Sequence, residues 1–126
     1  MANLTNPNKV VDVARLARYY DDSLVGVVQC TSSTIPATLA KDTYYNVTGT
    51  VSSMSLVLPT IADSTHLHAI SVCFTTSSGT PSVTISSAGS ATISYFSGYS
   101  IDASTTYELN IMWNGTKWIV AYATIE

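Results

Sequence analysis

The spacing of hydrophobic residues changes once along this chain, near Ser23. Before that point the hydrophobic positions recur every three or four residues, which is the period of a helix with one apolar stripe. They are Val10, Val13, Ala17, Tyr20 and Leu24, with Leu16 beside the stripe. After Ser23, hydrophobic and polar residues alternate in short runs, which is the period of strands. The sequence therefore predicts an N-terminal tail and amphipathic helix over residues 1–23, followed by a β domain over residues 24–126.

Short runs rich in β-branched and aromatic residues predict about eight strands in the second part of the chain. Six of them cover residues 24–30, 43–50, 54–58, 66–75, 82–86 and 92–96, and two more form a hairpin within residues 107–122. Glycine, proline and serine clusters separate the runs. Strands of this length at such regular spacing are typical of an antiparallel β-sandwich or a small barrel. The expected fold is therefore mainly β.

The hairpin is the best specified element of the chain. Asn114-Gly115 is the strongest short signal for a two-residue type I′ turn, because both turn positions need a positive φ. That turn predicts the cross-strand pairs Trp113–Thr116, Ile111–Trp118, Leu109–Val120 and Tyr107–Tyr122, all on one face. We expect this apolar face to form the centre of the core. The opposite face carries Met112 and Ile119 and is a candidate contact between subunits.

Charged residues make up only 10% of the chain, against roughly one quarter in typical soluble domains. From Leu24 onward the charged residues are Lys41, Asp42, Asp63, Asp102, Glu108, Lys117 and Glu126. A β-rich body this poor in charge has little with which to protect its edge strands from its copies, so burial in an oligomer is expected. The alternative is a monomer that its many hydroxyl groups keep in solution.

The composition also excludes some partners. The formal net charge of −3 and the pI near 5.1 argue against nucleic acid, which requires a clustered basic surface. No apolar run has the length of a membrane span, and the first residues lack the features of a signal peptide. We therefore expect no membrane insertion, and synthesis in a cytoplasm.

The predicted helix is too short to be stable alone in water, so it must dock. Two alternatives are open: it packs on its own β domain, or it packs on copies of itself or on a larger assembly. In the second case the stripe and the neighbouring Leu16 serve oligomerisation and anchoring through Val10, Val13, Leu16, Ala17, Tyr20 and Leu24.

Groups for catalysis are sparse, because the β domain offers few carboxylates, two histidines and two lysines. It contains neither a Gly-x-Ser-x-Gly motif nor a phosphate-binding glycine loop. We therefore expect no enzymatic activity and no organic cofactor. The two cysteines, Cys30 and Cys73, have no metal-ligand spacing and are expected to be buried free thiols, with a disulfide between strands as the alternative.

His66-Leu67-His68 has a spacing that suits metal binding. In a strand, residues i and i+2 share a face, so both imidazoles point the same way about 7 Å apart. Copies of the chain that meet at an axis would then surround one metal ion. The alternative is an exposed histidine pair at the start of a strand.

The segment from Tyr95 to Tyr99 is a candidate ligand-binding site. Exposed rings of Tyr95, Phe96 and Tyr99, beside Ser97 and Gly98, suit stacking on a sugar or peptide with adaptable hydrogen bonds. The alternative is a strand that ends at a glycine turn with one or two rings in the core.

Two stretches resemble segments of a known class of proteins. Val10-Val11-Asp12-Val13-Ala14-Arg15-Leu16-Ala17-Arg18-Tyr19-Tyr20-Asp21 resembles the short helical segment near the N-terminus of tailed-phage and prophage virion proteins of the fibre, baseplate and head-fibre kind. The stretch from Tyr107 to Val120 is similar to the closing hairpin of small Ser/Thr-rich β domains in such proteins. Together the two stretches cover about a fifth of the chain.

The resemblance implies a homo-oligomer, commonly a trimer, that is made in the bacterial host cytoplasm and becomes part of the virion. Its N-terminal part would attach to other virion proteins of the capsid or tail, and its β domain would project outward. The chain has no long shaft, collagen-like repeat or enzymatic domain, so the resemblance favours a short fibre, a head decoration or a baseplate component. The alternative function is a carbohydrate-binding β-sandwich that binds surface glycans through Tyr95, Phe96, Tyr99 and Trp113.

Overall fold

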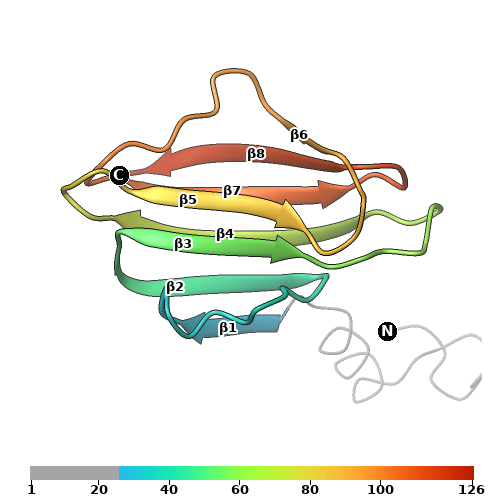
Figure 1. Ribbon diagram of the computed structural model, residues 1–126, viewed down its shortest axis with the longest axis horizontal. Coiled ribbons are helices and arrows are strands. Elements are labelled where there is room, and N and C mark those ends of the chain that lie inside the picture. Colours follow the sequence, from blue (N-terminus) through green and yellow to red (C-terminus); the bar gives the residue numbers. More distant parts are fainter. Residues whose placement is uncertain (1–25) are drawn as a thin grey trace, which may run out of the picture.

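The computed structural model describes residues 26–126, which form eight strands in two sheets (Figure 1). The strands are β1 (Gly26–Cys30), β2 (Thr43–Val51), β3 (Ser53–Leu58), β4 (His68–Thr76), β5 (Ser82–Ser87), β6 (Ile93–Tyr95), β7 (Thr106–Trp113) and β8 (Trp118–Ile125). The mainly β prediction is confirmed, and each predicted strand lies within a few residues of an observed one. The predicted helix, with Val10, Val13, Leu16, Ala17, Tyr20 and Leu24, lies outside the described residues.

The prediction of an antiparallel sandwich or barrel is wrong. Six strands form one sheet in the order β1-β2-β4-β7-β8-β6, and β3 pairs with β5 in a second, two-stranded sheet. The chain passes back and forth between the sheets from β2 to β5, so that β2 lies parallel to β4 and β3 lies parallel to β5. This arrangement is that of a short β-solenoid. Antiparallel pairing joins β4 to β7 and β7 to β8, while β1–β2 and β6–β8 are parallel.

Tight corners explain the coil. A single residue, Ser52, separates β2 from β3, and the chain changes sheets there. The next turn of the coil binds this corner, because the Ser77 N–H donates to the Val51 carbonyl and the Ser82 N–H donates to the Ser52 carbonyl, both at 2.9 Å. Each corner therefore satisfies its backbone groups through the corner stacked on it, as buried peptide groups require.

The β7–β8 hairpin is inserted between β4 and β6, in the position of a further turn of the coil. Its observed pairs are Trp113–Trp118, Ile111–Val120, Leu109–Tyr122 and Tyr107–Thr124, so the predicted register is wrong by two residues. The loop is longer than predicted because the Asn114 side chain accepts the N–H groups of Thr116 and Lys117. Gly115 alone takes a positive φ there, +94°, and a Cβ on it would lie 2.5 Å from the Ser64 carbonyl oxygen. A shift of two keeps each side chain on its predicted face.

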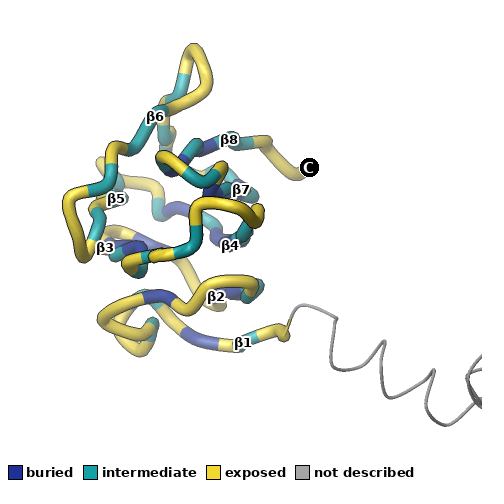
Figure 2. The backbone as a smooth tube through the Cα atoms, turned by 90° about the vertical axis from the view of Figure 1, so that its right-hand side faces the viewer, coloured by how far each residue is buried: buried dark blue, intermediate teal, exposed yellow. Residues whose placement is uncertain are grey.

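The core lies between the two sheets, on the side of the larger sheet that β3 and β5 cover (Figure 2). We call this side the inner face and the opposite side the outer face. The predicted core residues Leu109, Ile111, Trp118 and Val120 are completely buried, which confirms their assignment. Two buried tyrosines support loops in the same way: the Ala40 N–H donates to the Tyr45 hydroxyl, and the Asp102 N–H donates to the Tyr107 hydroxyl, both at 2.7 Å.

Candidate functional site

A row of aromatic rings runs from the core to the surface at β6. Phe74 and Tyr107 have ring centroids 5.7 Å apart, and Tyr107 lies 6.4 Å from Tyr122. Tyr122 meets the edge of Tyr99 at 5.4 Å, and Tyr99 lies 4.7 Å from Tyr95. Distances of this kind are those of favourable ring pairs. We call these five residues the aromatic row.

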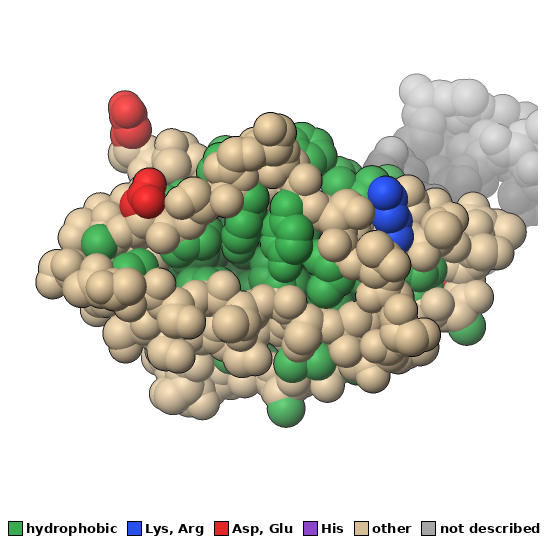
Figure 3. Space-filling model, turned by 45° about the horizontal axis from the view of Figure 1, so that its top comes forward, with side chains coloured by type: hydrophobic (Ala, Val, Ile, Leu, Met, Phe, Trp, Pro, Cys, Tyr) green, Lys and Arg blue, Asp and Glu red, His purple; other side chains and the backbone are tan. Residues whose placement is uncertain are grey.

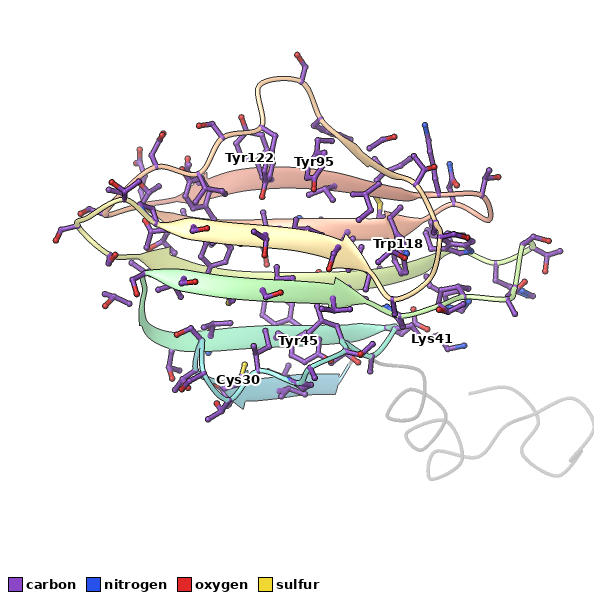
Figure 4. The ribbon with its side chains drawn as sticks, in the orientation of Figure 1. Cys30, Lys41, Tyr45, Tyr95, Trp118 and Tyr122 are labelled. Carbon is purple, nitrogen blue, oxygen red and sulfur yellow. The ribbon has the colours of Figure 1, made fainter. Side chains whose placement is uncertain are left out.

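The outer end of the row is held by backbone pairing. β6 lies parallel to β8, which places Tyr95 beside Val120, and the Phe96 N–H donates to the Val120 carbonyl. The chain then turns at Gly98, whose φ of +80° favours glycine, and this turn brings Tyr99 back against Tyr95. Figure 4 shows Tyr95 and Tyr122 near each other beneath the loop that follows β6.

Exposure distinguishes the members of this site. Tyr95 is 43% exposed and Phe96 52%, whereas Tyr107 and Phe74 are buried. Tyr99 is half-buried, and its hydroxyl is buried without a hydrogen-bond partner among the described residues. Burial, with smaller contributions from Tyr95 and Tyr107, raises the pKa of Tyr99 to about 12. Its hydroxyl therefore remains protonated near neutral pH and can donate a hydrogen bond.

The structure thus brings Tyr95 and Tyr99 together and leaves Phe96 exposed beside them, while Trp113 lies elsewhere. Trp113 is buried, and its Nε1–H donates to the Asp63 carbonyl at 2.8 Å. Sequence reasoning missed Tyr122, because its place in the row depends on the pairing of β6 with β8.

The surface around the row is apolar and nearly free of charge. Figure 3 shows the side of the molecule that carries β6 and the following loop: hydrophobic side chains gather in a hollow, and the few charged groups lie towards the ends. Exposed rings in such surroundings can stack on the apolar faces of a neutral ligand such as a sugar.

A second candidate is an open cleft of about 340 Å³ beside the hairpin. Hydroxyl side chains dominate its lining, which includes Thr60, Ser87, Ser90, Thr92 and Thr116, and no ionisable side chain contributes. The cleft can therefore offer hydrogen bonds to a neutral polar ligand.

The two histidines are arranged differently from the prediction. β4 begins at His68, so His66 lies in the preceding loop and the pair does not share one strand face. Both imidazoles instead approach the Asp63 carboxylate: His66 Nδ1 lies 2.6 Å and His68 Nε2 lies 3.6 Å from Oδ2. The other nitrogen of His68, Nδ1, is 2.9 Å from Asp42 Oδ2. We call these four residues the histidine–aspartate cluster.

Hydrogen bonding lowers the pKa of both carboxyl groups in the cluster. The N–H and hydroxyl of Thr65 hold the pKa of Asp63 far below its usual value, and His66 adds to this effect. Burial acts to raise the pKa of Asp42, but hydrogen bonds from His68 and the Ala69 N–H outweigh it and lower the pKa. The aspartates, which the sequence did not single out, thus join the starts of β2 and β4.

The cluster has no geometry for a metal ion within one chain. Among residues 26–126, no group of three or more histidine, cysteine, aspartate and glutamate side chains is placed to hold one. A metal at an axis between copies, bound by His66 and His68, stays a prediction.

The cysteines are free thiols on opposite faces of the larger sheet. Cys30 lies beside Val47 on the inner face, and burial raises its pKa. Cys73 is half-buried beside Asn46 on the outer face. The thiols therefore point away from each other, which excludes a disulfide between them within the chain.

The structural description of residues 26–126 includes no helix that is long and apolar enough to cross a membrane. Comparisons of the chain with protein-family models, with curated proteins and with solved structures found no match.

Proposed function

We propose that this protein is a tailed-phage virion structural protein. It is a short homo-oligomeric, trimeric fibre or decoration protein that is attached to the head or tail and adheres to a host or environmental surface. Residues 10–24 anchor it to other virion proteins or join its copies, and the β domain projects outward. It acts by binding and needs no catalytic group.

The observation that carries the adhesive part of this proposal is the exposed end of the aromatic row. Tyr95 and Phe96 are large exposed side chains at consecutive positions, and the Tyr95 ring packs against that of Tyr99, which leads through Tyr122 to the core. A ring held in this way loses little conformational entropy when it binds, so Tyr95 suits adhesion to glycans through stacking.

The rest of the body favours a structural role. Two of its aspartates are engaged with histidines, and Glu108 accepts a hydrogen bond from the Tyr44 hydroxyl. Little charge is left to keep copies apart, which favours a protein that works as an assembly.

The virion role is tested on particles. Mass spectrometry of purified phage particles should detect this chain in stoichiometric amount, and native mass measurement of the full chain should give a trimer. Leu16→Asp or Ala17→Asp should abolish that assembly, because a charge in the apolar stripe is costly to bury. Absence of the chain from particles, or a clean monomer at high concentration, would contradict the proposal.

The alternative function is a carbohydrate-binding module that works apart from a particle, and the hydroxyl-lined cleft favours it. Glycan-array binding separates the two surfaces. If the aromatic row and the neighbouring Phe96 form the adhesive site, Tyr95→Ala or Phe96→Ala should weaken binding about tenfold each, while Thr84→Ala on the exposed side of β5 should not. If Thr92→Val in the cleft abolishes binding and Tyr95→Ala does not, the cleft is the site.

A further inference from the structure

The outer face of the larger sheet has an unusual surface. Its central row runs across five strands through Val27, Tyr44, Ser71, Asn110 and Ala121, which the strand register places side by side. No described strand covers this face, since β3 and β5 both lie on the opposite side (Figure 2). The face is therefore available to another protein surface as far as residues 26–126 are concerned.

Charge is almost absent from this face. Glu108 is the single carboxylate on the described strands of this face, and its Oε1 accepts a hydrogen bond of 2.7 Å from the Tyr44 hydroxyl. That bond raises the pKa of Tyr44, with burial adding to the effect, so the hydroxyl stays a donor. A partner surface that carries unpaired charges would meet nothing here to neutralise them.

The polar side chains of the face bind one another sideways. Asn46 Nδ2 donates to Gln29 Oε1 at 2.8 Å, and Ser71 Oγ donates to Asn110 Oδ1 at 3.1 Å. Thr75 and Thr106 share a hydrogen bond of 2.7 Å in the same way. Burying a polar group is costly mainly when it loses its partner, and these groups keep theirs.

The size of the face suits a stable contact. The five strands are spaced by about 4.8 Å and have five to nine residues, about eight on average, so the face measures roughly 600 Å². Each copy that packs this face against the others buries that area, so a pair of copies buries about 1,200 Å² together, at the lower end of the range of specific protein interfaces.

We propose that the outer face is the interface between copies of this chain. The other copies of the trimer supply the same surface around its axis, with the same lack of charge and the same internally bonded polar groups. This inference rests on the homo-oligomer of the proposed function and assigns its contact to the β domain, in addition to residues 10–24.

Cys73 reports directly on this contact, because its thiol lies on the outer face beside Asn46 and Glu108. Maleimide labelling of the full chain, mapped by mass spectrometry, should be fast in dilute protein and slow at concentrations where copies associate. Cys30 on the inner face is the internal control and should label slowly throughout.

Ala121→Arg places a charge in the central row of the face, on β8, and should weaken self-association roughly a hundredfold, with fast Cys73 labelling restored. Asn110→Arg, at an exposed position of the same row, should weaken self-association in the same way. This second variant keeps the test valid if Ala121→Arg fails to fold. The matched control is Thr84→Arg, which puts the same charge on the exposed side of β5 and should behave as the wild type.

Two results would overturn the inference. In the first, the wild type associates but its Cys73 is labelled as fast as that of Ala121→Arg. In the second, Cys73 stays protected in the dilute monomer, which would mean that residues of the same chain cover the face. The proposed function is tested separately. If Cys73 shows concentration-dependent protection but the protein is absent from phage particles, the interface between copies stands and the virion role is refuted.

Discussion

The two faces of the six-stranded sheet are built from the same strands but are stabilised differently. On the inner face, Ile70, Val72 and Ile111 are completely removed from water. On the outer face, the neighbours Ser71 and Asn110 remain accessible and bind each other. Burial of apolar surface holds the inner face together, whereas lateral hydrogen bonds order the outer face without closing it off. One face therefore makes the fold, and the other is free to make contacts.

The largest effect should come from adjacent residues of β8 that lie on opposite faces. Trp118 is fully buried with its ring 5.4 Å from that of Trp113, whereas Ile119 is half-buried on the outer face. Trp118→Ala should lower the free energy of unfolding by about 3–5 kcal/mol, because it leaves a large cavity. Ile119→Ala should cost about 1 kcal/mol or less. Urea unfolding at low protein concentration measures both, and equal losses would contradict the division into two faces.

The positions of the strands could be predicted because they follow from local period alone. The alternation that makes Ile70 and Val72 buried and Ser71 accessible is visible in the sequence. The pairing of strands was not visible. The predicted strands over residues 43–50 and 54–58 leave Ser52 in an ordinary connection, yet the chain changes sheets there, and the bonds that select the coil come from Ser77 and Ser82 in the next turn.

Of the candidate site, likewise, only the part that depends on local sequence could be predicted. Tyr95, Phe96 and Tyr99 are neighbours in sequence around a glycine turn, so their grouping is local. Tyr122 joins them through the β6–β8 pairing, and Asp42 reaches His68 across 26 residues. Contacts of this kind depend on which strands pair. The predicted antiparallel sandwich or barrel pairs the strands differently and therefore does not predict them.

A smaller effect should separate two consecutive tyrosines of β2. The Tyr45 hydroxyl, on the inner face, accepts the Ala40 N–H, so Tyr45→Phe leaves that donor unpaired and should cost about 1–3 kcal/mol. Tyr44→Phe removes the bond to Glu108 on the outer face, where water can replace it, and should cost about 0.5–1 kcal/mol.

Thermal unfolding of both variants at low protein concentration tests this difference. Tyr107→Phe is the matched second case, since its hydroxyl accepts the Asp102 N–H in the same geometry, and it should resemble Tyr45→Phe. A Tyr44→Phe variant less stable than Tyr45→Phe would mean that the outer face also contributes to holding the monomer together.

The smallest effect should appear in acid, in the histidine–aspartate cluster at the start of β4. The folded protein lowers the pKa of Asp63 and Asp42, so these groups stabilise it above their unfolded pKa near 3.9. That contribution is lost as pH falls below about 4 towards the folded values. The Asp63→Asn variant lacks this carboxyl group, so the free energy of unfolding of the variant should depend less on pH in this range than that of the wild type.

Denaturant unfolding between about pH 5 and pH 2 measures the effect, which is small because water screens exposed side chains. Thr65→Val is an independent check: it removes one of the hydrogen bonds that lower the pKa of Asp63 and should flatten the same part of the curve less than Asp63→Asn does. If Asp63→Asn kept the full acid dependence of the wild type, Asp63 would not be its source. The dependence would then have to come from another carboxyl group, and Asp42 in the same cluster is the first to substitute, because its pKa is also lowered.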